Sequence, residues 1–230
     1  MPRQHRAKRG EGSTTAAEIK TTAWHQIAER GAPVLSLRAI ARELGITAPA
    51  IYNYYPRRDD LVTALIIDTY ADFGNAQLAA INDIPAKDLM ERLMAVGVAY
   101  RQWALKYPER YQLIFGTPIP GYVAPLDKVL PIAARSLTAL VSVLEALRVQ
   151  NKLQVTRDLP VDPDKLVMFE TWKKVGMEVD IQSFSIAVLV WARVHGLVSL
   201  EISNNLPPFG PSPDALYQYE LDAIGKEFVK

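Results

Sequence analysis

Tyrosines, an asparagine and two arginines are crowded into the run YNYYPRR at residues 52–58. Phenol hydroxyls and guanidinium groups donate hydrogen bonds to phosphate oxygens, and asparagine hydrogen-bonds base edges or phosphates. Tyr52, Asn53 and Tyr54 therefore carry side chains suited to nucleic acid, with Arg57 and Arg58 close behind them in the sequence. This combination of residue types indicates a surface that contacts a nucleic-acid backbone.

A structural interpretation of the same residues is also open. Tyr52 and Tyr55 would then form the edge of a core, and the two arginines would cap a helix or pair with Asp59 and Asp60. We assign Tyr55 to the core. For the other residues we favour nucleic-acid contact, because small polar and basic residues gather on one short helix.

The elements that must position these side chains are two short helices around a glycine. Ser36 is placed to cap a helix that Gly45 ends. Thr47 is placed to cap the next helix, where Pro49 is tolerated in the first turn. That second helix ends at Tyr55, since a residue before proline avoids the helical region.

Apolar residues repeat at helical spacing on both sides of the glycine turn. An earlier helix carries the stripe Ile19, Ala23 and Ile27. The residues predicted to hold the unit together are Leu37, Ile40, Ala41, Leu44, Ile46 and Ile51. Three helices in this order are the outline of a helix-turn-helix. Ala48 and Ala50 then face outward, where small side chains permit close approach and methyl contact with thymine.

The run LSLRAIARELGITAPAIYNYYPRRDDLV, residues 35–62, resembles the DNA-binding signature of TetR-family transcriptional regulators. The recognition helix of that family ends in a Tyr-x-x-(Phe/Tyr) pattern followed by a basic residue. Residues 52–55 match this pattern, and Arg58 takes the place usually held by lysine. The resemblance covers residues 15–64.

This resemblance implies roles for individual residues. Phosphate contacts are implied for Thr47, Tyr52, Tyr54 and Arg58, and positions nearest the base edges for Ala48, Pro49, Ala50 and Asn53. Arg38 takes the place of a further contact in that family, and Arg57 begins the next helix beside the same phosphates.

The charge distribution agrees with a local contact to a polyanion. The net charge is +1, but residues 1–60 contain ten Lys/Arg and six Asp/Glu, a balance of +4, against −3 for residues 61–230. Positive charge concentrated at one end favours a polyanion there. A solvated basic tail would produce the same asymmetry.

The sequence shows no pattern typical of a catalytic or metal-binding site. The chain has no cysteine, which excludes disulfides, zinc–thiolate sites and cysteine nucleophiles. The histidines His5, His25 and His195 are scattered, and no paired carboxylate motif is visible. We predict no catalytic site, no metal site and no cofactor, and an enzyme is the least favoured class.

Apolar residues recur at spacings of three and four along the chain, and period-two alternation never persists. This predicts an all-α protein of about nine helices. We expect a flexible basic arm over residues 1–12, a three-helix helix-turn-helix DNA-binding domain over 13–60, and a larger helical effector-binding and dimerisation domain over 61–230. Helices are predicted over 58–78, from Pro85, over 108–115, over 127–150, from Asp162-Pro163-Asp164, over 180–203 and from Ser212.

Membrane insertion is not expected. The longest run without a charged residue, Tyr111 to Leu126, is interrupted by prolines and glycines, and a spanning helix needs ~20 apolar residues. The basic N-terminus leads into no apolar signal region. We therefore expect a cytoplasmic protein.

The larger domain carries a second resemblance. WARVHG at residues 191–196 is similar to the Trp-x-x-x-His-Gly (WHG) motif of a group of TetR-like C-terminal domains, and residues 107–118 resemble the corresponding stretch of that group. His195 is either a ligand contact or pH sensor, or a buried histidine bonded to a neighbouring helix. We favour the buried histidine, because no second metal ligand or nucleophile accompanies it.

A mostly apolar cavity between the helices is predicted for an effector, with the loop 116–126 as its mouth. The candidate lining residues are Met94, Trp103, Tyr107, Tyr111, Phe115, Phe169, Trp172 and His195. Each such residue taken alone is more often part of a core. The scarcity of ionisable groups among them favours an apolar or amphipathic small molecule.

The sequence as a whole predicts a ligand-responsive, sequence-specific DNA-binding transcriptional regulator, a repressor released from its operator by a small effector. Its predicted partners are a double-stranded operator with inverted repeats, an unknown small molecule, and a second copy of the chain. We expect the two copies to pair through the last two helices, where Ala192 and Gly196 leave a smooth patch. The alternative is a helical small-molecule-binding protein with no role on DNA.

Overall fold

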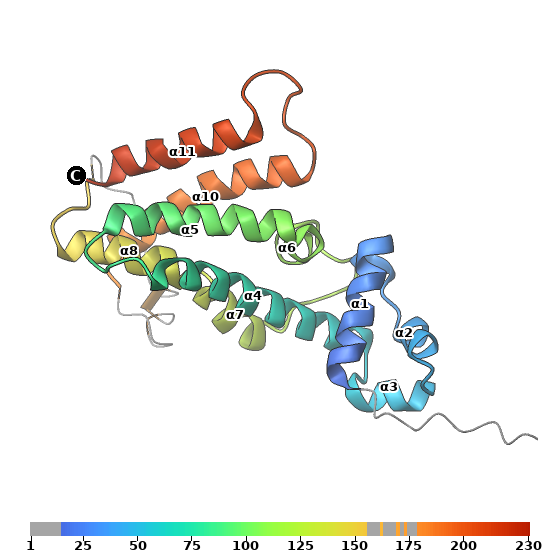
Figure 1. Ribbon diagram of the computed structural model, residues 1–230. Coiled ribbons are helices and arrows are strands. Elements are labelled where there is room, and N and C mark those ends of the chain that lie inside the picture. The colour runs from blue at the N-terminus through green and yellow to red at the C-terminus, as the bar shows by residue number, and fades with distance from the viewer. Residues whose placement is uncertain (1–14, 156–161, 163–168, 171–172, 174–178) are drawn as a thin grey trace, which may run out of the picture. The chain divides into compact units, whose positions relative to one another are not determined.

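The computed structural model describes residues 15–155, 162, 169–170, 173 and 179–230 (Figure 1). Within these residues the chain forms α-helices, one short 3₁₀ helix and a single antiparallel bridge between Leu153 and Val229, with no strand. The all-α prediction is confirmed. The predicted arm over 1–12 and most of the helix predicted from Asp162-Pro163-Asp164 lie outside the described residues.

The chain divides into two compact units. The first comprises residues up to Leu65 together with Pro118–Tyr122, and the second comprises Ile66–Thr117 and Val123–Lys230. One helix, α4 (Arg58–Asn82), contributes residues to both units.

The first unit contains three helices and the start of α4. The elements are α1 (Ala16–Arg30), the 3₁₀ helix η1 (Ala32–Val34), α2 (Leu37–Leu44) and α3 (Ala48–Tyr54). Thr15 and Glu18 form a reciprocal capping box at the start of α1, and Ser36 Oγ accepts from the Ala39 amide at the start of α2. Gly45 ends α2 in the left-handed conformation at φ 68°, which glycine adopts without steric cost.

The core of the first unit is built from the predicted stripes. Ile19, Ala23, Ile40 and Ile51 are fully buried. Further buried residues are Ile27, Leu35, Leu37, Ala41, Tyr55, Leu61, Val62 and Leu65. Tyr55, assigned to the core from the sequence, is 8% exposed. The segment 118–122 joins this unit through buried Ile119 and through the Tyr122 hydroxyl, which lies 2.9 Å from Thr63 Oγ1.

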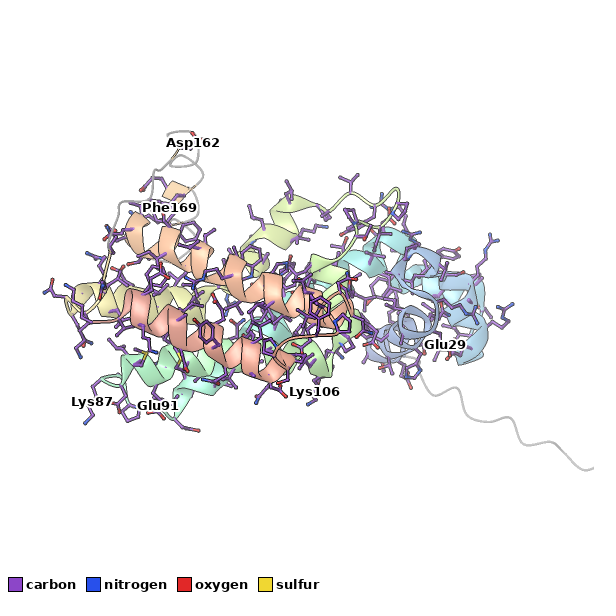
Figure 2. All side chains as sticks on the ribbon, turned by 90° about the horizontal axis from the view of Figure 1, so that it is seen from above. Glu29, Lys87, Glu91, Lys106, Asp162 and Phe169 are labelled. Atoms are coloured by element: carbon purple, nitrogen blue, oxygen red, sulfur yellow. The ribbon has the colours of Figure 1, made fainter. Side chains whose placement is uncertain are left out.

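The second unit is a helical bundle. Besides the rest of α4 it contains α5 (Leu89–Lys106), α6 (Pro108–Phe115), α7 (Leu126–Arg135), α8 (Thr138–Val149), α10 (Ile181–Ile202) and α11 (Pro213–Phe228). Helix α5 packs against α8, α10 and α11, and α10 packs against α8 and α11. Helix α11 runs alongside α10 in both views (Figures 1 and 2).

The single helix predicted over residues 127–150 is wrong. The structure has α7 followed by α8, with an angle of 51° between them. Pro131 lies inside α7, where it has no amide hydrogen to donate and its ring crowds the preceding turn. The chain turns at buried Ser136, whose carbonyl accepts a hydrogen bond from Gln77 Nε2 at 3.2 Å. A side-chain amide on α4 thus satisfies a carbonyl at the break between α7 and α8.

Helices α5 and α11 approach closely at Gly97. A Cβ at this position would lie 2.5 Å from the Leu221 side chain, and the buried Tyr217 hydroxyl donates to the Gly97 carbonyl at 2.6 Å. Arg101, one turn further along α5, bonds both carboxylate oxygens of Glu201 on α10 at 2.6 and 2.7 Å. These polar contacts fix the register of the three helices.

Helix α10 is long and apolar enough to cross a membrane by length and composition, with a mean hydropathy of 1.5 over its most apolar stretch. The core helix of a soluble protein passes the same test. Arg193 on α10 is ion-paired with Glu220 and Glu227 of α11, and Glu201 with Arg101. These ion pairs tie α10 to α5 and α11 within the bundle.

Candidate nucleic-acid interface and internal cavity

The outward face of α3 carries the residues predicted for nucleic-acid contact. Ile51 is fully buried and Tyr55 nearly so, and together they anchor the helix to the first unit. The opposite side presents Thr47, Ala48, Pro49 and Asn53 as exposed residues, with Ala50 half-buried. Tyr52 and Tyr54 are 37% and 42% exposed. The structure therefore places seven of the predicted contact residues around the part of α3 that Ile51 and Tyr55 leave outside the core.

Thr47 occupies the predicted N-cap position of α3 with extended backbone, but its side chain makes no capping hydrogen bond. The N-cap side chains Thr15, Ser36, Asp180 and Ser212 all accept a bond from a backbone amide of their own helix. Among the described residues the Thr47 hydroxyl has no partner. An exposed hydroxyl that the fold does not use suits a contact with phosphate.

The two arginines after α3 make contacts within the first unit. The Arg57 guanidinium donates to both carboxylate oxygens of Asp60, at 2.9 and 3.3 Å. Arg58 Nη1 donates to the Pro33 carbonyl at 3.3 Å, and Arg58 Nε lies 3.5 Å from Asp59 Oδ1. The ion pairs that the sequence offered as an alternative are therefore present. Exposed ion pairs are weak because water screens them, so phosphate can compete for these guanidinium groups.

Arg38 lies on α2 as an exposed side chain and forms no ion pair with any described residue. It is a free cation on the helix that precedes α3, as the sequence analysis expects of a further phosphate contact.

His195 lies in a polar cluster inside the second unit. The Tyr100 and Tyr111 hydroxyls each lie 2.9 Å from His195 Nδ1, and Ser199 Oγ lies 2.7 Å from the Tyr111 hydroxyl and 3.3 Å from Nε2. We assign the hydrogen to Nε2, so that the single lone pair of Nδ1 accepts from one of the two phenols. Burial lowers the pKa of His195 and raises the pKa values of Tyr100 and Tyr111, which keeps all three groups uncharged at neutral pH.

Aromatic rings enclose this cluster. The Trp191 ring stacks on the imidazole of His195 with centroids 4.8 Å apart, Tyr111 stacks on it at 5.7 Å, and Phe115 meets it edge-on at 5.0 Å. The environment is that of a histidine bonded to neighbouring helices, the interpretation that the sequence favoured.

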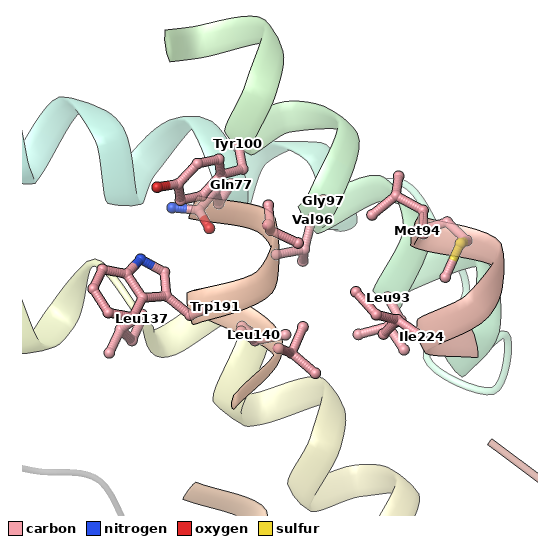
Figure 3. Close-up of a pocket in the computed structure, with 13 residues that line it drawn as sticks. Gln77, Leu93, Met94, Val96, Gly97, Tyr100, Leu137, Leu140, Trp191 and Ile224 are labelled. Carbon is pink, nitrogen blue, oxygen red and sulfur yellow. The ribbon is translucent and has the colours of Figure 1, made fainter. Parts of the chain in front are cut away.

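An internal cavity lies among α4, α5, α8, α10 and α11 within the second unit (Figure 3). Its volume of ≈ 20 Å³ has room for about one water molecule. The walls are mostly aliphatic side chains, and the polar groups come from Gln77, Tyr100 and Trp191.

The predicted effector residues occupy different parts of the second unit. Met94 lines the cavity. Trp103, Tyr107, Tyr111, Phe115 and His195 belong to the aromatic cluster, which also includes Phe73 and Tyr100. Phe169 packs on Phe184 with ring centroids 5.2 Å apart, and Trp172 lies outside the described residues. Contact of these residues with an effector stays a prediction.

Sequence reasoning did not single out Gln77 or the aliphatic wall of the cavity. Methionine and aromatic residues were the predicted lining, whereas most of the wall is formed by leucines, valines and an isoleucine at ordinary helical spacing. One feature of the sequence could have indicated Gln77. It is a polar residue four positions from the apolar Phe73 and Ile81, so it lies on the same side of the helix.

The fold and the exposed α3 face define a transcriptional regulator that binds DNA through a helix-turn-helix. The chain belongs to the TetR family: residues 8–65 match the bacterial regulatory proteins of the tetR family, and residues 93–224 match the tetracyclin repressor-like C-terminal domain. The resemblance to the WHG group within that family stays a prediction.

Known relatives agree with this assignment. The HTH-type transcriptional regulator Rv1816 of Mycobacterium tuberculosis is 33% identical over 186 residues, which cover 81% of this chain and 80% of the relative. The crystal structure of the putative regulatory protein SCO4313 is 34% identical, with a TM-score of 0.72, and the match covers 90% of this chain and 93% of that one. These relatives indicate a regulator rather than an enzyme.

Two more distant structures share the fold and contain small molecules. A putative transcriptional regulator from Saccharomonospora viridis was crystallised with choline, at 18% identity and a TM-score of 0.67 over 93% of this chain and 97% of that one. SmeT was crystallised with triclosan, at 13% identity and a TM-score of 0.63 over 93% of this chain and 91% of that one.

The half-buried His195 should make the stability of the fold depend on pH. Its pKa is lower in the folded chain than in the unfolded chain, so the unfolded chain takes up a proton first as the pH falls. Folding stability should therefore decrease from pH 7.5 to pH 5.5, through the unfolded pKa of about 6.5, by at most about 1.4 kcal/mol for this residue. The test is urea unfolding at both pH values for the wild type and His195→Gln.

The variant should lose this part of the pH dependence. His25→Gln is the matched control, because His25 is exposed on α1. A wild-type pH dependence that persists unchanged in His195→Gln would show that His195 is not the group responsible.

Proposed function

We propose that the chain is a homodimeric repressor that binds an inverted-repeat operator in the cytoplasm and is released by a small apolar or amphipathic effector. The DNA-binding role is supported chiefly by the exposed side of α3. Ile51 anchors this helix in the core, and its exposed side presents two tyrosines, Asn53 and the Thr47 hydroxyl, which makes no capping bond. In this arrangement the phosphate contacts orient the helix and Asn53 reads a base edge.

A twofold dimer fits the exposed surface of α10. Val188, Ala192, Gly196 and Leu200 are four residues apart and therefore share one face of that helix. Val188 and Leu200 are 39% and 43% exposed, and a Cβ at Gly196 would meet no atom of the chain within 4 Å. On the neighbouring α11, Tyr219 is 73% exposed. A second copy would cover this apolar strip, and two recognition helices would then reach successive major grooves.

The effector part of the proposal is supported by the internal cavity and by the fold. Two proteins with this fold bind choline and triclosan, which shows that the architecture accommodates small molecules. An effector acts only if its affinity differs between the DNA-binding and released states. Binding inside the bundle would change the separation or mobility of the two DNA-binding units.

If α3 binds DNA as proposed, substitutions of Thr47 and Asn53 should change different properties, the overall affinity and the base preference. Thr47→Val removes one hydroxyl without changing side-chain size, and it should weaken binding to all DNA sequences by about 1.5 kcal/mol per protomer, the scale of a hydrogen bond to a charged group. Asn53→Ala should relax the preference at one base pair of each half-site. The measurement is fluorescence anisotropy with operator DNA selected from a random pool and with single-base variants of it.

Thr21→Val is the matched control, because Thr21 is an exposed threonine on α1 that bonds its own helix. It should leave DNA affinity unchanged. Binding that survives Tyr52→Ala combined with Arg58→Ala undiminished would contradict the proposed interface.

The dimer proposal predicts a contrast between two substitutions of one residue. Gly196→Trp fills space that is open within the chain, so each protomer should fold normally but the dimer should dissociate and lose operator affinity. Gly196→Ala adds only a methyl group and should remain dimeric. Light scattering after size exclusion gives the mass, and circular dichroism checks the fold. A Gly196→Trp protein that stays dimeric at low micromolar concentration would place the interface elsewhere.

A further inference from the structure

The cavity in the second unit contains no charged group. Its lining has no Asp, Glu, Lys, Arg or His, and its ionisable Tyr100 is held neutral by burial. An ion placed there would lose its hydration without gaining a counter-charge, which is strongly unfavourable. The cavity therefore discriminates against charged molecules, including carboxylates and amines that are ionised at neutral pH.

One hydrogen-bonding atom in the wall has no partner in the described chain. Gln77 is 3% exposed, and its Nε2 donates to the Phe73 and Ser136 carbonyls, each at 3.2 Å. Two carbonyl partners can be satisfied only by the NH₂ group, so the orientation of the amide is determined. Oε1 is then left as an acceptor on the cavity side of the side chain, with no donor among the described residues.

The Tyr100 hydroxyl of the wall is already engaged. It lies 2.9 Å from His195 Nδ1. In Figure 3 Gln77, Tyr100 and Trp191 occupy one end of the cavity, and Leu93, Met94 and Ile224 occupy the other. The cavity is thus amphipathic, and Gln77 Oε1 is an acceptor in its wall for which the described residues provide no donor.

We propose that this cavity is the effector site and that it selects an uncharged molecule with an apolar body and a hydroxyl or N–H group at one end. The donor bonds Gln77 Oε1, and the apolar body lies toward Leu93, Met94 and Ile224. This inference rests on the proposed effector-responsive function and adds the chemical class of the effector.

Entry of such a molecule requires the helices to separate, because the volume of ≈ 20 Å³ is smaller than any alcohol of several carbons. Met94 is the adaptable part of the wall, since methionine is unbranched and changes rotamer readily. Ser136 connects the same wall to the break between α7 and α8 through Gln77. A donor that engages Oε1 therefore acts directly on the residue that ties α4 to this break.

The test uses three probes of equal length with the full-length protein at pH 7.5. 1-Octanol carries a donor, heptyl methyl ether has no donor, and octanoate is an anion. Isothermal titration calorimetry should show 1-octanol binding about 5-fold more tightly than the ether, the worth of one neutral hydrogen bond. Octanoate should bind at least about 100-fold more weakly than 1-octanol.

Gln77→Met keeps the length of the side chain and removes the acceptor, so it should bind 1-octanol and the ether equally well. Gln102→Met is the matched control, because Gln102 is an exposed glutamine on α5, and it should keep the 5-fold preference. If Gln77→Met does not fold, Met94→Trp, which fills the apolar end, should abolish binding of both neutral probes to a folded protein.

Equal affinity of the wild type for 1-octanol and the ether, or tighter binding of octanoate, overturns the inference. A different result would contradict the proposed function of effector-controlled release. Selective binding of 1-octanol with no change in operator affinity supports the site chemistry and contradicts the effector-controlled release. Operator binding with no 1-octanol binding contradicts the inference alone.

Discussion

Helix α3 is held in place by the burial of one side, and the nucleic-acid interface depends on that constraint. A helix of seven residues is not stable in isolation, since nucleation costs more than so few hydrogen bonds return. Ile51, fully buried, and Tyr55 supply the stability by packing into the core of the first unit. The other side chains of α3 are small, polar or aromatic with a hydroxyl, and all of them except Ala50 are exposed.

The second unit is governed by a different constraint, the need to satisfy buried polar groups. Pro131 and the turn at Ser136 break what would be one helix, and the Gln77 amide bonds the Ser136 carbonyl. The same amide consequently presents its oxygen to the cavity. His195 is a second example, because a phenol hydroxyl bonds Nδ1, Ser199 Oγ lies beside Nε2, and burial lowers the pKa of the imidazole. Structural hydrogen bonds thus determine which polar atom remains for a ligand.

Most of the fold could be predicted from local signals in the sequence. Ser36, Gly45 and Thr47 delimit the helices of the first unit, because caps and left-handed glycines act over a few residues. The break at Ser136 could not be predicted from the sequence. A proline inside a helix is compatible with either a kink or an interruption, and packing decides between them. The cavity depends on side chains from five helices that are distant in sequence, so no single pattern marks Gln77 or the leucines around it.

The central claim is that the chain is a dimeric DNA-binding regulator whose α3 face meets phosphates and base edges. Footprinting of the intact protein on the DNA that adjoins its own gene, at several salt concentrations, tests it most directly. We predict two protected half-sites with centres ~34 Å apart on one face of the duplex, and an affinity that falls steeply as salt rises. Absence of a protected site, or binding that is insensitive to salt, would contradict the account.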